Sequence, residues 1–332
     1  MNKIDKSLQQ VDYNYFVVKG DGKMITQSTA SRGVRNGLEM LDVREGQHVM
    51  EIGTGSGFSG ALLSTLVGPT GSVVSIDIEP HLTSRARELC EKKELNNIFH
   101  ATRDGRKGFE SGKPYDRIIA WTTPESFPIA WSDQLQEGGL IVIPFQVLPI
   151  ARCIVTVCLR KVNGILQGEA VASESYIMMS SEPMQDLKEL AGYHVQAELV
   201  GEGDEAAWAS SRWLKENPSQ EWLDKFTSTQ PESLPFEETG EEIRAYLLGK
   251  NPEGFTNACH PESGSWIGYS SPTGFALASG HQSGQWLVTD SLHADVLRNW
   301  WNEWKRLGKP RFKQLQPVLV GDQVKVKLKG GE

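Results

Sequence analysis

The first half of the chain alternates short apolar runs with longer segments of helical periodicity. Helices are predicted at Ser59–Leu66, where apolar residues dominate, and at Pro80–Lys93, which carries many charges. The apolar runs predict buried strands at His48–Ile52, Ser72–Asp77, Ile98–Thr102, Asp116–Ala120 and Leu140–Pro144. Strands that alternate with helices in this way are typical of βαβ units, so we expect a doubly wound α/β domain on a parallel sheet.

A different pattern follows these strands. Arg152–Arg160 and Gly164–Ala172 predict a hairpin of antiparallel strands. Beyond about residue 185 the composition changes, and we expect a smaller α+β domain with a helix at Leu292–Leu307. The short strands of this domain are predicted at Ser265–Tyr269, Gly274–Ala278, Gln285–Thr289 and Val324–Leu328.

Two segments of the second half are predicted as linkers or loops. They are Val200–Ala207, which is small and acidic, and Pro231–Glu242, which is acidic and interrupted by proline. The second half as a whole is nevertheless expected to fold, because eight of the ten tryptophans lie between Trp208 and Trp304. We therefore divide the chain into a domain of residues 1–187 and a C-terminal domain of residues 190–332.

Composition and charge exclude several functional classes. Hydrophobic residues make up 39% of the chain and charged residues 23%, which is typical of a folded globular protein. The net charge of −8 argues against a protein built to bind nucleic acid phosphates. No apolar stretch is long enough to span a bilayer, and no signal peptide is visible. We therefore expect no membrane partner. Since the four cysteines form no CxxC pair, we also expect a reduced cytoplasmic protein.

The charges are unevenly spread along the second half. Glu198–Glu242 holds twelve acidic and three basic residues, a net charge of −9, and Arg298–Lys329 holds nine basic and two acidic residues, a net charge of +7. The simpler interpretation is two solvated surfaces of opposite sign that face each other. The alternative is a basic surface that steers an acidic peptide or protein partner.

The strongest chemical signal is the sequence VMEIGTGSG at Val49–Gly57. A strand that runs into glycines before a helix allows a sharp turn and the close approach of a ligand. Gly55–Gly60 matches the dinucleotide fingerprint GxGxxG, but that motif alone is weak. An acid followed by GxGxG better fits S-adenosylmethionine, whose cationic groups favour nearby carboxylates. The expected cofactor contacts in this turn are Glu51, Gly53, Thr54, Gly55, Ser56 and Gly57.

Two further acids follow the next strands of the predicted sheet. Asp77 ends the second strand, where a carboxylate can accept both ribose hydroxyls. Asp104 follows the third strand, where a carboxylate can bind the adenine amino group. The glycine turn and both acids, in order at the strand ends of one sheet, predict a single cofactor site. Ile78 and Gly105, each next to one of the acids, complete the expected set.

At these positions the chain resembles the protein-L-isoaspartate O-methyltransferases. The resemblance covers about residues 15–185 and rests on EIGTGSGF (Glu51–Phe58), VVSID (Val73–Asp77), DGRKGF (Asp104–Phe109), PYDRII (Pro114–Ile119) and LQEGGLIVIP (Leu135–Pro144). It implies a doubly wound sheet and an enzyme that uses S-adenosylmethionine to methyl-esterify a peptide carboxylate, with S-adenosylhomocysteine as product.

The family has a Thr-x-Ser-Ala-Pro-His segment upstream of the glycine turn, whose serine acts at the substrate carboxylate. The corresponding stretch here is Thr26–Arg32, in which Ser31 and Arg32 replace the proline and histidine. The resemblance places Thr29 at the serine position, with Ser28 as the alternative if the loop slips by one residue. The other possibility is that either hydroxyl caps the helix that begins at about Ser31.

Trp121 departs from the family, which usually has small residues after the fourth strand. Its indole either reshapes the peptide site or packs under the second domain. The residues expected to line the substrate site are Gln27, Ala30, Ser31 and Trp121.

The expected chemistry needs little acid–base help. A carboxylate is a nucleophile at neutral pH and the sulfonium methyl is a strong electrophile, so catalysis is expected to be mainly alignment. No metal site is expected, because Cys259, His260, His281 and His293 are too scattered for a zinc pattern.

Three functions remain open. The layout resembles a subgroup associated with ribosomally made, modified peptides, in which a normal aspartate is esterified and the next backbone nitrogen then forms an aspartimide. The second possibility is a general isoaspartate repair enzyme, although we expect such enzymes to lack the C-terminal domain. The third is a binding module that keeps the fold without turnover. The helix segment WWNEW places Trp300 and Trp304 on one face, which is more often core than a ligand platform.

Overall fold

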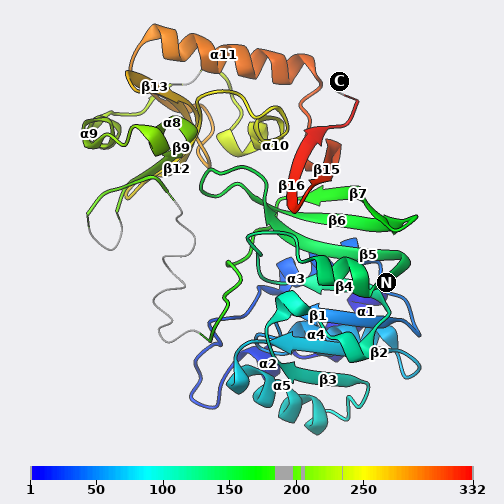
Figure 1. Ribbon diagram of the computed structural model, residues 1–332. Helices are drawn as coiled ribbons and strands as arrows, with labels where there is room; N and C mark the ends of the chain where they lie inside the picture. Colours follow the sequence, from blue (N-terminus) through cyan, green and yellow to red (C-terminus); the bar gives the residue numbers. More distant parts are fainter. Residues whose placement is uncertain (1, 184–196, 203–205, 234, 331–332) are drawn as a thin grey trace. The chain divides into compact units, whose positions relative to one another are not determined.

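The computed structural model describes residues 2–183, 197–202, 206–233 and 235–330, which form two compact units (Figure 1). The described residues up to 145, those from 154 to 183 and those from 317 to 324 make up the first unit. The remaining described residues make up the second. The boundary predicted between residues 187 and 190 lies outside the described residues.

The first unit contains a seven-stranded sheet in the order β3-β2-β1-β4-β5-β6-β7. The pairs β1–β2, β2–β3, β1–β4 and β4–β5 are parallel, and β6–β7 is antiparallel, so the predicted doubly wound sheet and closing hairpin are confirmed. The strands are β1 (His48–Ile52), β2 (Ser72–Asp77), β3 (Ile98–Thr102), β4 (Tyr115–Ala120), β5 (Leu135–Gln146), β6 (Ile154–Val162) and β7 (Ile165–Ala172).

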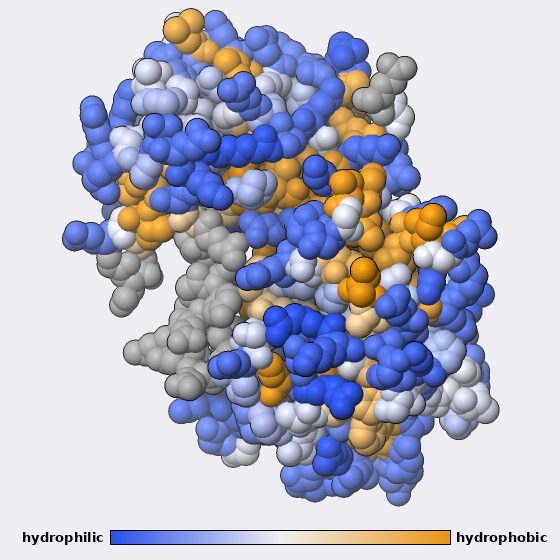
Figure 2. Space-filling view, in the orientation of Figure 1, coloured by the Kyte–Doolittle hydropathy of each residue, from blue (hydrophilic) through white to orange (hydrophobic). Residues whose placement is uncertain are grey.

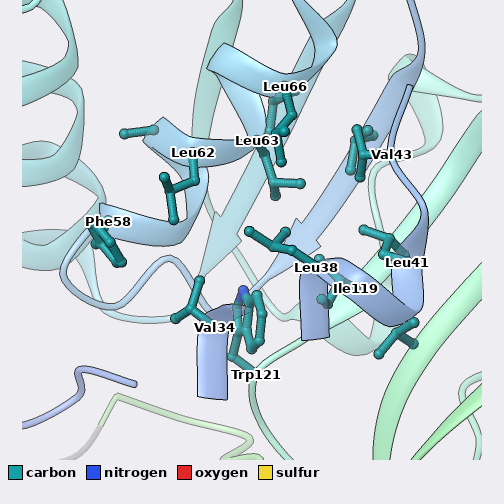
Figure 3. Packing of buried hydrophobic residues seen from close by; sticks show 14 of the residues in the cluster. Val34, Leu38, Leu41, Val43, Phe58, Leu62, Leu63, Leu66, Ile119 and Trp121 are labelled. Carbon is teal, nitrogen blue, oxygen red and sulfur yellow. The ribbon is translucent and has the colours of Figure 1, made fainter. Parts of the chain in front are cut away.

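Helices α3 and α4 pack on the same face of this sheet. Figure 3 shows Val34 and Leu38 of α3 beside Ile119 and Trp121, with Leu62 of α4 in the same cluster. Burying each aliphatic side chain of this kind contributes roughly 1.5–3 kcal/mol. The helices of this unit are α1 (Lys3–Gln10), α2 (Tyr13–Val17), α3 (Ser31–Leu41), α4 (Phe58–Val67), α5 (Pro80–Lys92), α6 (Ile129–Gln134), and the short η1 (Gly105–Lys107) and η2 (Glu110–Gly112).

The strand order reverses between β1 and β4. Chain segments that follow these two neighbouring strands therefore lie side by side at the carboxyl edge of the sheet, where ligands of doubly wound folds bind. The segments are the glycine turn Gly53–Gly57 after β1 and residues Trp121–Pro124 after β4.

The second unit is built on an antiparallel sheet in the order β10-β14-β13-β12-β11-β9-β8, which confirms the expected α+β architecture. Its strands are β8 (Leu199–Val200), β9 (Trp208–Ser211), β10 (Glu232–Ser233), β11 (Phe255–His260), β12 (Gly264–Ser271), β13 (Gly274–Ser279) and β14 (Gln285–Val288). Its helices are α8 (Arg212–Glu216), α9 (Gln220–Ser228), α10 (Gly240–Lys250) and α11 (Ser291–Arg306).

The prediction that Pro231–Glu242 is a linker or loop is wrong in part. The segment contains β10 and the first turn of α10, where the backbone N–H of Thr239 donates to Glu242 Oε2 at 2.9 Å. Acidic residues at this end of a helix are stabilised by the exposed N–H groups of its first turn. The acidic residues near Glu242 therefore belong to the start of a helix, although the sequence pattern of this segment is also typical of a solvated loop.

Most tryptophans of the second unit form its core. Trp301 and Trp304 of α11 are fully buried. Trp208, Trp222, Trp266 and Trp286 are also buried, each with at most 4% of its surface exposed. Trp300 is partly exposed and packs edge-to-face against Tyr269 with 5.7 Å between ring centroids. Trp304 is therefore core, as the helical spacing favoured, whereas Trp300, expected on the same face, is only partly buried.

The acidic and basic stretches face each other within this unit. Glu238 pairs with Lys305 at 3.1 Å and with Lys309 at 2.7 Å, and Glu242 pairs with Arg311 at 3.0 Å. Burial opposes ionisation of Glu238, but the two lysines hold its pKa down at about 2. These contacts bear out the simpler interpretation of the charge pattern.

The C-terminal hairpin consists of β15 (Leu315–Val320) and β16 (Gln323–Leu328) and follows the short η3 (Phe312–Gln314). Its tip belongs to the first unit, in which the backbone N–H of Phe127 donates to Asp322 O at 2.7 Å. Residues 317–324 thus belong to the first unit, whereas the described residues after them belong to the second.

Hydrophilic residues cover most of the face shown in Figure 2, between smaller hydrophobic patches. Within the described ranges, no helix combines the length and the apolarity needed to cross a membrane.

Candidate active site

The glycine turn after β1 is fixed by backbone hydrogen bonds to the end of β2. Gly53 N donates to Ile76 O at 2.7 Å and Gly55 N donates to Asp77 Oδ2 at 2.9 Å. Gly53, Gly55 and Gly57 have φ angles of +93°, +50° and +87°, which side-chain-bearing residues rarely adopt. A Cβ on Gly55 would also collide with the carbonyl oxygen of Gln27, so glycine is required on two grounds.

Asp77 holds this turn in place. Besides the bond from Gly55, its Oδ1 accepts a hydrogen bond from Glu79 N at 3.0 Å. Burial raises the pKa of the Asp77 carboxyl, and the backbone donors oppose that rise. An ionised carboxylate can accept about four hydrogen bonds, so Asp77 keeps capacity for a ligand hydroxyl. Ile78, between the two residues, is partly exposed at the same edge.

Glu51 lies inside the fold, not on the surface of the turn. Its Oε1 accepts hydrogen bonds from Ser59 Oγ at 2.5 Å and Trp121 Nε1 at 2.9 Å, and its Oε2 accepts one from Ser75 Oγ at 2.6 Å. Thr54 extends the network through a 2.7 Å bond between its Oγ1 and Ser75 Oγ. Complete burial raises the pKa of Glu51 to about 7 against these three donors. The carboxylate therefore braces β1, β2, α4 and the end of β4.

Trp121 is 5% exposed and lies in the core of the first unit. Its ring sits against Gly37 of α3, where a Cβ would approach within 2.7 Å, and packs edge-to-face on Tyr176 at 5.7 Å. Figure 3 shows the indole beside Val34 and Leu38 of α3. A contact between Trp121 and a substrate remains a prediction.

The segment predicted to carry the substrate hydroxyl lies directly on the glycine turn. The carbonyl of Gln27 touches Gly55, and Ser28 Oγ is buried with no hydrogen-bond partner among the described residues. Thr29 is partly exposed, with its Cγ2 packed near Gly33. Ala30, which is exposed, is the N-cap of α3, and no side chain caps this described helix start. Neither hydroxyl therefore serves as the helix cap considered as their alternative role.

A hydroxyl that sequence reasoning missed lies across the turn. Thr122 follows β4, and its Cγ2 lies 3.4 Å from the Cβ position of Gly53. Its Oγ1 is buried and has no hydrogen-bond partner in the part of the chain that is described. The next residue, Thr123, is different, because its Oγ1 donates to Tyr176 O at 2.8 Å. Thr122 and Ser28 thus place two unpaired hydroxyls around one glycine turn.

Asp104 follows β3 in a loop that α6 secures. Arg106 Nε and Nη2 donate to the two oxygens of Asp104, each at 2.9 Å, and these bonds lower the pKa of Asp104. Gly105 lies so close to the Ile52 side chain that a Cβ would collide with it, and Trp131 Nε1 donates to Gly105 O at 2.8 Å. The loop is thereby held against the end of β1.

Arg85 of α5 supports the site and was not predicted. Its guanidinium donates to the carbonyl oxygens of Phe16 at 2.6 Å, Val18 at 3.1 Å and Ser56 at 3.1 Å. It therefore ties the N-terminal segment to the glycine turn. In the sequence it is one arginine in a charged helix, and no local pattern distinguishes it.

Taken together, the structure brings the glycine turn, Asp77 and the Gln27–Thr29 segment into direct contact at one sheet edge. Asp104 joins them through the bond from Arg103 N to Asp77 O, 2.9 Å long. Among the described residues, no three His, Cys, Asp or Glu side chains gather as a metal site. The arrangement can hold a ligand with vicinal hydroxyls and orient an oxyanion beside it.

The comparisons with known proteins agree on one family. The sequence model of the protein-L-isoaspartate(D-aspartate) O-methyltransferase family matches residues 3–183. A protein-L-isoaspartate O-methyltransferase of Ignicoccus hospitalis is 40% identical over 112 residues, 34% of this chain and 53% of that protein. One from Methanococcus maripaludis strain C5 is 32% identical over 148 residues, 43% of this chain and 66% of that protein. The matches therefore span about half to two thirds of these relatives.

A solved structure titled protein-L-isoaspartate O-methyltransferase resembles the chain with a TM-score of 0.52 at 17% identity. The resemblance covers 99% of this chain and 95% of that chain, and thus extends over both units. The expectation that repair enzymes of this family lack the C-terminal domain therefore does not hold for the protein in that structure.

Proposed function

Because the chain belongs to the protein-L-isoaspartate(D-aspartate) O-methyltransferase family, we propose that it transfers a methyl group from S-adenosylmethionine to a peptide or protein carboxylate. The observation that carries this proposal is the glycine turn bound to Asp77 at the strand-order reversal, with the Gln27–Thr29 segment lying on it. The proposed cofactor residues and the proposed substrate hydroxyls are therefore neighbours.

The residues present fit S-adenosylmethionine. Positive φ angles and the absence of side chains at the glycines leave the backbone accessible to the amino-acid end of the cofactor. Asp77 has lone pairs for the ribose diol, and Asp104 lies at the next strand end, beside the place expected for adenine. When bound, the cofactor supplies an electrophilic methyl group.

The protein's own task is to orient the carboxylate. The ionised carboxylate needs no general base, so hydroxyls and backbone N–H groups have only to fix its direction of approach. Thr29 and Ser28 are the proposed donors, and Gln27, Ala30 and Ser31 line the same segment. The buried, unpaired Ser28 Oγ supports this role, because a buried hydroxyl without a partner is costly unless a ligand satisfies it.

We further propose that the substrate is a normal aspartate in a constrained or cyclised ribosomal peptide. The carboxylate oxygen bonds to the methyl carbon as the bond to sulfur breaks, which releases S-adenosylhomocysteine. The next backbone nitrogen then attacks the ester carbonyl and expels methanol, leaving an aspartimide one water lighter than the original peptide. Support comes from Ser31 and Arg32, which replace the family's proline and histidine in the hydroxyl segment. A second unit in which most tryptophans are buried offers a rigid scaffold for substrate contacts.

General isoaspartate repair is the second candidate. It is supported by the family and by the names of the relatives, one of which shares the fold of both units. A binding module without turnover fits less well, because the acids and hydroxyls of the site are all present. For either enzyme we propose a cytoplasmic setting, since all four cysteines are free thiols.

The test is a mass-spectrometric competition with the full chain. A linear isoaspartyl peptide and a cyclic peptide containing a normal aspartate are mixed with S-adenosylmethionine. The proposal predicts methylation and then net loss of water on the cyclic aspartate alone. Efficient methylation of the linear isoaspartyl peptide alone would establish the repair activity instead. If neither peptide is methylated, the result favours a binding module without turnover. The full chain is used because residues 317–324, far along the sequence, belong to the first unit.

A further inference from the structure

A cleft within the second unit is lined by two arginines. It opens to solvent and lies between Arg152, Trp208 of β9, Arg244 of α10 and Ser265 of β12. Glu241 lines it as well and pairs with Arg244 at 3.0 Å. Two guanidiniums and one carboxylate leave a net positive charge in the cleft.

The backbone around Arg152 is held firmly. Ala151 N donates to Ser210 Oγ at 2.8 Å, Asn257 Nδ2 donates to Ala151 O at 2.8 Å, and Arg244 donates to the carbonyl oxygen of Arg152 itself. Arg152 has a φ angle of +61°, in the left-handed region that a non-glycine residue occupies at an energetic cost. The surrounding bonds impose this conformation and so fix the direction in which the side chain leaves the backbone.

The Arg152 guanidinium lies over the Trp208 ring, 5.2 Å from its centroid. The Arg152 guanidinium donates no hydrogen bond to any described side chain or carbonyl, so its N–H groups are available to a ligand. Among the described residues, no carboxylate lies within ion-pair distance of Arg152. An exposed arginine with a fixed backbone and an aromatic support is a prepared site for a planar anion.

A further polar group in the cleft has no partner. Ser265 Oγ is buried and makes no hydrogen bond to any described residue. A Cβ on Gly280 would collide with it, so the glycine leaves room around the hydroxyl. A carboxylate at the edge of Arg152 can accept from the guanidinium and from such a hydroxyl together.

We propose that this cleft binds a carboxylate of the peptide substrate other than the one that is methylated. The proposal rests on the proposed function and adds to it that the substrate carries a second anionic group, recognised by Arg152 on Trp208. The source of that group is either an acidic side chain or a free C-terminus. Both present the same planar oxyanion, and the arms of the test separate them.

The test follows the Trp208 indole resonance in the full chain carrying isotope-labelled tryptophan, assigned with Trp208→Phe. N-acetylglutamate α-amide provides a side-chain carboxylate, and N-acetylalanine provides a C-terminal carboxylate. N-acetylglutamine amide and N-acetylalanine amide are the matching neutral controls. We expect the carboxylates to shift this resonance at low ionic strength and the neutral amides to leave it unmoved. Tighter binding of one carboxylate probe identifies the source of the anion. Equal shifts with the neutral amides, or no shift, would overturn the proposal.

The variants sharpen the result. Arg152→Gln is expected to weaken carboxylate binding about 10-fold or more. Arg298→Gln is the matched control, because Arg298 also lies 5.2 Å over a tryptophan, Trp286, but pairs with Asp295 outside the cleft. We expect Arg298→Gln to leave binding unchanged. Binding that survives Arg152→Gln would contradict the assignment.

A kinetic arm connects the cleft to turnover. Arg152→Gln should raise KM for an acidic peptide substrate while kcat is retained, and should not change KM for its neutral counterpart. The binding measurements need no methyl transfer, so they stand or fall independently of the proposed activity. Carboxylate binding without any turnover would contradict the proposed function while leaving the anion site intact.

Discussion

Trp121 Nε1 donates a hydrogen bond of 2.9 Å to Glu51 Oε1, joining the end of β4 to the carboxylate beneath the glycine turn. The space for the indole comes from Gly37 of α3, because any side chain there would meet the ring. The bulky residue after β4 is thus matched to a buried acid on β1 and a glycine on α3. Its presence is explained by the packing of the first unit.

The first prediction concerns this hydrogen bond. Trp121→Phe keeps an aromatic ring but leaves a buried carboxylate oxygen with one donor fewer, and we expect a loss of about 1–3 kcal/mol in the free energy of unfolding. Urea unfolding of Trp121→Phe, Glu51→Met and the double variant measures the coupling, because methionine keeps the length of the side chain but has no oxygen to accept the bond. Strictly additive losses would contradict a direct interaction between the two side chains.

The second prediction is a pH dependence of stability. Folding raises the pKa of Glu51 from an ordinary value of 4.5 to about 7 through burial, so the folded state binds more protons between these values. The contribution of Glu51 to stability is then full below pH 4.5 and falls as pH rises through 7, by on the order of 3 kcal/mol.

Glu51→Gln isolates that contribution. The amide cannot ionise, and the hydroxyls of Ser59 and Ser75 can rotate to accept from its NH2 group. Denaturant unfolding between pH 4.5 and 7 should show the free energy of unfolding of the variant rising relative to that of the wild type as pH increases. A constant difference between the two proteins would show that Glu51 does not titrate in this window.

The third prediction concerns the proposed substrate hydroxyls. Thr29→Ala should lower turnover roughly 10- to 1000-fold, the effect of one oriented hydrogen bond in a partly dry site, with little change in cofactor affinity. Ser28→Ala is measured alongside, because its Oγ is the buried and unpaired one. Unchanged turnover in both variants would show that the alignment of Thr26–Arg32 with the family's segment is wrong.

The fourth prediction concerns Thr122. Thr122 lies beside Gly53 and its Oγ1 is unpaired, so Thr122→Val should lower kcat roughly 10- to 100-fold and Thr122→Ser should retain most of it. Thr123→Val provides the contrast, because that hydroxyl is already bonded to Tyr176 O and its loss should lower the melting temperature instead. Equal kcat in Thr122→Val and wild type would assign Thr122 to packing alone.

The parallel strands were predictable because each is a short apolar run buried on both faces. His48–Ile52, Ser72–Asp77 and Ile98–Thr102 have the bounds read from the sequence. The glycine turn and Asp77 were predictable for a related reason, since strand ends of one parallel sheet fix where their next residues lie. The local sequence is therefore enough to predict the strands and the residues that follow them.

Other features depend on contacts that no local pattern contains. The first turn of α10 was hidden in an acidic stretch, because glutamates serve equally as helix starts and as solvated loops. The carbonyl contacts of Arg85 reach residues about 30 and 70 positions away in the sequence. The exchange of short segments between the units, such as residues 317–324, is likewise a property of the assembled chain.

The most direct test of the central claim is a calorimetric titration of the full chain with S-adenosylmethionine. Gly55→Val places side-chain atoms against Gln27 O and the ligand path, whereas Gly22→Val, also at a positive φ, has open space around its Cβ. We expect wild type and Gly22→Val to bind with equal affinity and Gly55→Val to bind at least about 10-fold more weakly. Equal affinity in all three, or no binding to the wild type, would contradict the assignment of this turn as the cofactor site.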